Sequence, residues 1–97
     1  MTDVVIIKTL IGEEIIAEFV SPCHPMLENS ITLSRPRVLQ FHQDGNDMKT
    51  ALVPWLITDP DNREVPMSGS YIVSMLVAPS DIARAYLSQV SGIQIAK

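Results

Sequence analysis

The stretch from Val4 to Val20 limits the possible fold more than any other part of the sequence, because it reads as two β-strands around Gly12. β-Branched and other apolar residues fill both halves, and a glycine between two such runs is typical of a hairpin. One face of this hairpin is almost wholly apolar and is expected to face the core: Val5, Ile7, Thr9, Ile15, Ala17 and Phe19. The other face mixes charged and apolar residues, and Ile6 and Ile16 indicate that it is partly covered too, with a helix as one candidate cover.

Three further strands are predicted after the hairpin, whose own strands span about 4–11 and 13–20. They cover about 30–42, 49–57 and 68–77. Pro36 cannot donate to a strand ladder, so the third strand is expected to bend near it. Asp44 and Gly45 predict a tight hairpin turn, because this pair readily supplies positive φ angles.

One short helix is predicted at the C-terminus, over about 80–91. Ser80 is a candidate N-cap, Asp81 suits the positive end of a helix, and Gly92 is a candidate C-cap. Apolar residues recur between them at helical spacing: Ile82, Ala85, Tyr86 and Val90. Short strands that bend at prolines and end in one helix predict a mainly β chain, with 1–97 as a single domain and the five strands closed into a small barrel.

Composition narrows the class of protein further. A chain of 97 residues with 46% hydrophobic residues cannot bury them all, so self-assembly through an exposed apolar surface is expected. A formal net charge of −4 disfavours bulk electrostatic binding of nucleic acid, which leaves only a local basic patch for that purpose. Cys23 is the only cysteine, which excludes an internal disulfide and fits a reducing, cytoplasmic location (of the host cell for a viral protein). No apolar run is long enough to span a membrane, and no membrane partner is expected.

The hairpin resembles the first sequence motif of the Sm and Sm-like RNA-binding ring proteins. That motif has alternating hydrophobic residues, a turn glycine, and then a small residue between two hydrophobic ones; its matches here are Val5, Ile7, Thr9, Gly12, Ile15, Ala17 and Phe19. Asn29, Ile31 and Leu33 resemble the asparagine-containing loop and strand that follow. Met67, Ser68 and Gly69 look like the second motif, where the family has Ile-Arg-Gly. The whole chain also resembles the Sm-like proteins of presumed cyanophage origin found in ocean metagenomes.

This resemblance implies a small, strongly bent five-stranded Sm-like (SH3-type) barrel that assembles into a cyclic homo-oligomer of about five to seven subunits. Neighbouring subunits would pair the fourth strand of one with the fifth of the next, through Leu52, Val53, Trp55, Ile57, Tyr71, Val73 and Met75. A base would be bound between two loops, at Asn29 with His24 as a stacking group, and at Ser68 and Gly69. The chain departs from the family at Ser68, at Val20–Ser21 where an acidic residue is usual, and in having its helix at the C-terminus.

Arg35 and Arg37 are the best candidate basic patch, since phosphate contacts need clustered cations. The alternative is that they are solvated strand-edge charges that prevent aggregation. His24 can equally be an idle loop residue, Asn29 can cap a turn, and the Trp55 and Tyr71 rings can pack in the core or an interface rather than stack on bases.

The sequence therefore predicts an oligomeric Sm-like module that binds RNA, or single-stranded DNA, weakly and with little sequence preference. The alternative is a protein-interaction or assembly component, viral in origin, that binds no nucleic acid. Catalysis is not expected, because Cys23 and His24 are adjacent and point apart in an extended chain. No metal site and no cofactor are predicted, since no ligand spacing or phosphate-binding glycine loop is present.

Overall fold

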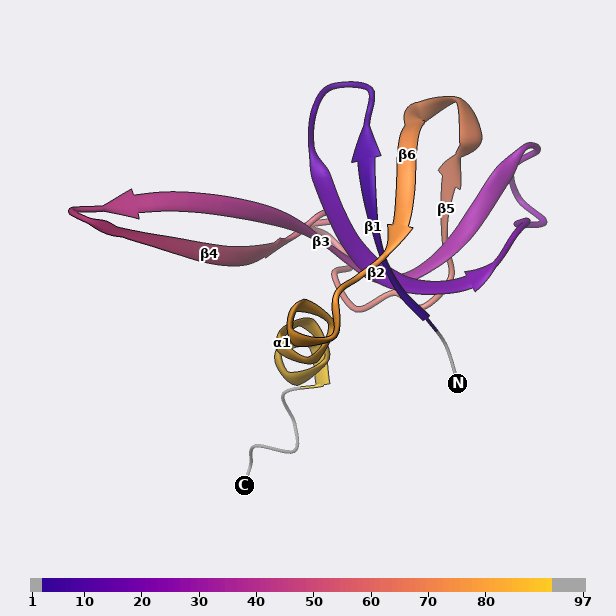
Figure 1. The fold of residues 1–97 in the computed structure, drawn as a ribbon. Helices are drawn as coiled ribbons and strands as arrows, with labels where there is room; N and C mark the ends of the chain where they lie inside the picture. Colours follow the sequence, from indigo (N-terminus) through magenta and orange to yellow (C-terminus); the bar gives the residue numbers. More distant parts are fainter. Residues whose placement is uncertain (1–2, 92–97) are drawn as a thin grey trace.

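The computed structural model describes residues 3–91, which form one antiparallel sheet and one α-helix (Figure 1). The predicted mainly β chain with a C-terminal helix is confirmed, and the candidate C-cap Gly92 lies outside the described residues. The sheet runs in the order β4-β3-β2-β1-β6, and β5 pairs with β3 beside this path. The elements are β1 (Asp3–Thr9), β2 (Glu14–Ser21), β3 (Ser30–Asp44), β4 (Asp47–Pro54), β5 (Val65–Ser68), a 3-10 turn (Gly69–Tyr71), β6 (Ile72–Val77) and α1 (Ser80–Ser91).

The predicted hairpin is β1 and β2. Val5 lies opposite Ala17 and Ile7 lies opposite Ile15, so the apolar face forms one side of the sheet. Gly12 turns the chain with a φ of 91°, which favours a residue without a β-carbon. This face belongs to the inner core, as predicted, where Leu33 of β3 and Met67 of β5 pack with it; the buried residues of this core are Val5, Ile7, Ile15, Ala17, Leu33 and Met67.

β3 bends near Pro36, as the sequence predicts. Arg35 has a φ of 51°, and its N–H leaves the ladder to donate to the Asn62 carbonyl at 2.7 Å. Before the bend β3 pairs with β5, and after it with β4, while β2 runs alongside both parts. The outer half of β3 and β4 form a two-stranded ribbon that projects from the body (Figure 1). Asp44 pairs with Asp47 across its tip, so the predicted tight turn is confirmed.

The structure has six strands in place of the predicted five. The predicted strand 49–57 ends at Pro54, and the predicted strand 68–77 begins only at Ile72, with β5 as an additional strand before it. Between β5 and β6 the Ser68 side chain accepts a hydrogen bond from the Ser70 N–H, which stabilises the 3-10 turn. Within residues 3–91 the sheet is open, because β4, β5 and β6 each pair with one strand only and not with one another.

α1 covers the second face of the hairpin, as Ile6 and Ile16 indicated. The buried residues of this outer cluster are Val4, Ile16, Ala78, Tyr86 and Val90, and Ile6, Leu39, Leu52, Ile82 and Ala83 pack against it. Apolar contacts to β1, β2, β3 and β4 therefore hold the helix on the sheet. Among residues 3–91, no helix combines the length and the apolar character that crossing a membrane requires.

Candidate assembly and nucleic-acid sites

The β6 strand forms an unpaired, apolar edge. Its side chains from Val73 to Val77 are all exposed, including the large apolar ones of Val73, Met75, Leu76 and Val77. The Ala78 N–H donates to the Val4 carbonyl at 2.9 Å, which sets the alternation of an antiparallel ladder: Ser74, Leu76 and Ala78 bond to β1, up to the register shift at Thr9. The backbone groups of Met75 and Val77 therefore point outward, away from β1.

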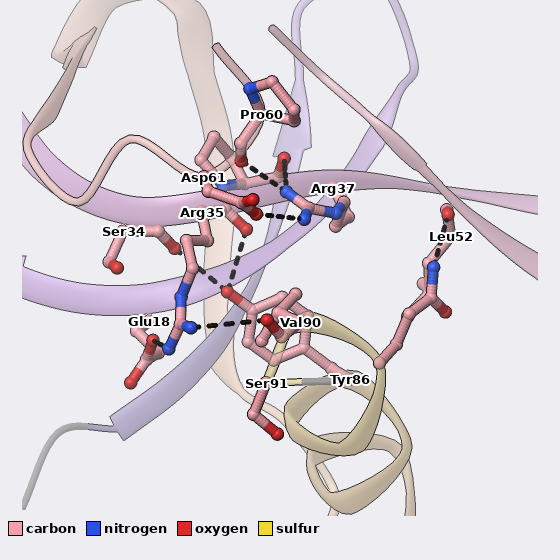
Figure 2. Close-up of polar contacts among 12 residues, drawn as sticks. Glu18, Ser34, Arg35, Arg37, Leu52, Pro60, Asp61, Tyr86, Val90 and Ser91 are labelled. Carbon is pink, nitrogen blue, oxygen red and sulfur yellow. Dashed lines mark hydrogen bonds and ion pairs between the residues drawn. The ribbon is translucent and has the colours of Figure 1, made fainter. Parts of the chain in front are cut away.

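The β4 strand forms the opposite edge of the sheet. The Trp55 N–H donates to the Pro36 carbonyl at 3.2 Å, so odd-numbered residues bond to β3 and even-numbered ones point outward. Pro54 occupies one outward position, where its missing N–H costs no ladder bond. At another outward position of β4, the Leu52 carbonyl accepts a hydrogen bond of 2.9 Å from the Gln89 side chain of α1 (Figure 2). The open part of this edge is therefore the segment 48–52.

The residues that the resemblance assigned to the subunit interface fall into four places. Val73 and Met75 lie on the exposed β6 edge, and Leu52 and Val53 lie on β4. Ile57 is 85% exposed in the loop between β4 and β5. Trp55 and Tyr71 are half-buried and pack against the inner core.

The two loops expected to bind a base meet at Asn29 and Gly69. The Gly69 N–H donates to the Asn29 carbonyl at 2.7 Å, and Asn29 holds a φ of 53°. A β-carbon on Gly69 would lie 2.9 Å from that carbonyl oxygen, so the close approach requires glycine. Ser68 lies next to this contact, and its hydroxyl is 2.8 Å from that of Ser70. The structure thus brings Asn29, Ser68 and Gly69 together.

The His24 ring is tied into its own loop. Its Nδ1 accepts a hydrogen bond from the Met26 N–H at 3.0 Å, so the proton is on Nε2, which donates to the Glu64 carbonyl at 3.0 Å. Both nitrogens are therefore used, Nδ1 within the loop after β2 and Nε2 to join this loop to the one before β5.

Arg35 and Arg37 are bonded within the fold (Figure 2). Arg35 lies 2.7 Å from the Glu18 carboxylate and also donates to the Val90 carbonyl at the end of α1. The hydrogen bond with Glu18 raises the pKa of Arg35. The Arg37 side chain is 9% exposed and lies 2.8 Å from Asp61. Neither guanidinium group points into solvent as a patch for phosphate.

Tyr86 links α1 to the bend in β3. Its hydroxyl is buried and donates to the Ser34 and Arg35 carbonyls, each at 2.9 Å (Figure 2). Burial raises the pKa of Tyr86 to about 12. Helical spacing identifies Tyr86 as a core residue, but no sequence signal reveals this bond or the one from Gln89, because their partners are 52, 51 and 37 residues away.

No protein-family model matches the chain, and a search of curated proteins finds no significant similarity. No group of three or more His, Cys, Asp or Glu residues within 3–91 is arranged to hold a metal ion. Function is therefore inferred from the two sheet edges and from the contact between Asn29 and Gly69.

Proposed function

We propose that the protein is an Sm-like module that assembles with copies of itself, edge to edge, into a cyclic homo-oligomer of about five to seven subunits. The observation that supports this most directly is the open sheet, with the apolar β6 edge at one end and the segment 48–52 of β4 at the other. An exposed, unpaired and apolar strand edge pairs readily with another chain. Pairing β6 of one copy with β4 of the next uses these two edges, and closing the ring leaves neither of them exposed.

In this proposed assembly, the bent sheet of each subunit is an Sm-like barrel that the strands of neighbouring subunits complete. β4 and β6 fall largely within the two predicted strands that the resemblance assigned to subunit contacts. The projecting ribbon supports the need for a partner, because a two-stranded ribbon alone is only marginally stable in water. Its residues 40–50 are all exposed within one chain, including Phe41 at 58% and Met48 at 64%.

Met75→Pro tests this assembly. The Met75 N–H points outward, so proline removes a donor that only a neighbouring subunit would use. We expect the variant to keep its far-ultraviolet circular dichroism but to sediment as a smaller species than the unchanged protein. Ser74→Pro is the matched control, because the Ser74 N–H bonds to β1 and its loss should unfold the chain. A Met75→Pro variant that assembles as before would refute the proposed pairing.

A second function is weak binding of single-stranded RNA or DNA at the loops that meet at Asn29 and Gly69. The hydrogen bond of 2.7 Å from the Gly69 N–H to the Asn29 carbonyl supports this proposal, because it holds the two loops in contact. With Arg35 and Arg37 bonded internally and a net charge of −4, phosphate contacts are few and sequence preference is expected to be small.

Fluorescence anisotropy with short U-rich and A-rich strands, at two salt concentrations, tests this second function. Binding should weaken as salt rises, and Asn29→Gly should weaken it further, since glycine keeps the positive φ but removes the side-chain amide. The absence of binding at low salt would leave the alternative, an assembly component that binds no nucleic acid, which would fit a viral structural role.

A further inference from the structure

An open pocket of about 420 Å³ lies beside the turn between β5 and β6. Its lining is apolar and aromatic, with Leu10, Trp55, Pro66, Met67 and Tyr71, except for the serines at 68 and 70. No charged side chain lines it. Its volume is within the range of ligand-binding pockets, and it contains no residue of β4 or β6.

Two hydrogen-bond donors of this pocket have no partner among the described residues. Within residues 3–91 the Trp55 indole N–H has no hydrogen-bond partner and is not a buried atom. The Ser68 and Ser70 hydroxyls lie 2.8 Å apart, so one of their two protons joins them and the other is available to a ligand. The Tyr71 hydroxyl is not available, because it donates to the Glu13 carboxylate at 2.7 Å.

We propose that this pocket binds a proline-rich segment of a partner protein in the polyproline II conformation. Proline offers a carbonyl acceptor and no N–H, which complements the two spare donors, the Trp55 N–H and one serine hydroxyl. Proline-rich segments dock into aromatic-lined grooves, and their preformed helix loses little entropy on binding. The absence of a lining cation makes the pocket unsuited to a phosphate group.

Trp55 provides the assay, because it is the only tryptophan in the chain. Titration of the full chain with a decaproline peptide should give a saturable change in Trp55 fluorescence, and a glycine–serine peptide of equal length should give none. Replacing both serines, Ser68→Ala with Ser70→Ala, removes one hydrogen bond to the ligand and should weaken decaproline binding about two- to tenfold.

Trp55→Phe removes the indole N–H and should weaken binding at least as much, measured by isothermal calorimetry. Phe41→Ala is the matched control, because that aromatic ring is exposed on the projecting ribbon, away from the pocket. If Trp55→Phe does not fold, as judged by circular dichroism, the double serine variant decides the question.

Four results would overturn the proposal. Decaproline at millimolar concentration that leaves Trp55 fluorescence unchanged would show that the pocket does not bind it. Equal binding of the glycine–serine peptide would show that the pocket does not select proline. Equal affinity in the double serine variant would show that the serine hydroxyls do not bind the ligand. A mononucleotide that quenches Trp55 where decaproline does not would assign the pocket to nucleobases.

Discussion

Tyr86→Phe should destabilise the fold by about 2–3 kcal/mol, although it removes a single oxygen atom. The Tyr86 side chain is fully buried, and its hydroxyl is shared by the Ser34 and Arg35 carbonyls, both at 2.9 Å. The lost hydrogen bond contributes about 1 kcal/mol, and a buried acceptor left without its partner costs about 1–2 kcal/mol more. The loss falls where α1 meets the bend in β3, so the helix and the sheet should lose stability together.

Urea unfolding followed by circular dichroism measures this cost, at one protein concentration so that assembly does not change the comparison. The midpoint should fall while the slope of the free energy of unfolding against urea stays the same. Tyr71→Phe is the matched control, because Tyr71 is only half-buried and its hydroxyl has one partner, Glu13. A Tyr86→Phe cost below about 0.5 kcal/mol, or one no larger than that of Tyr71→Phe, would refute the reasoning.

Arg37→Ala should cost about 1–3 kcal/mol in urea, because the largely buried guanidinium group donates to the Pro60 carbonyl and to the exposed Asp61 carboxylate; an unchanged midpoint would contradict this. The folded chain holds the Tyr86 proton more tightly than the unfolded chain does, since the pKa rises from 10.0 to about 12. Its contribution to stability should therefore be complete below pH 10 and disappear between pH 10 and 12, and a tyrosinate absorbance titration that shows Tyr86 ionising at its ordinary pKa would be inconsistent with this burial. Gly69→Ala should lower the thermal midpoint, since its β-carbon would lie 2.9 Å from the Asn29 oxygen, and a variant as stable as the original would mean that this contact gives way easily.

The parts of the fold that depend on neighbouring residues could be predicted from the sequence. The alternation around Gly12 identified the β1–β2 hairpin and its core face, and Asp44 with Gly45 identified the tip of the projecting ribbon. Pro36 marked the bend in β3, because a missing N–H acts locally whatever the tertiary structure. The packing of α1 against Ile6 and Ile16 could also be expected, since apolar residues on the second face of a hairpin need an element to bury them.

Features set by distant residues could not be predicted. Arg35 and Arg37 read as a basic patch because their partners Glu18, Val90 and Asp61 lie far along the chain. The expected five strands became six because the chain leaves the sheet after Pro54 and returns as the short β5, and apolar runs do not reveal such an excursion. The meeting of Asn29 and Gly69 was implied by the resemblance, whereas the tight contact that requires glycine emerges only from the structure.

Sedimentation equilibrium of the unchanged chain at micromolar concentration tests the central claim most directly. The open sheet, with β6 and the segment 48–52 unpaired, predicts that the chain assembles, and the resemblance to Sm-like rings implies one species of about five to seven chains. A monomer at the same concentration would contradict the account, because both edges would then remain exposed to water in the working protein.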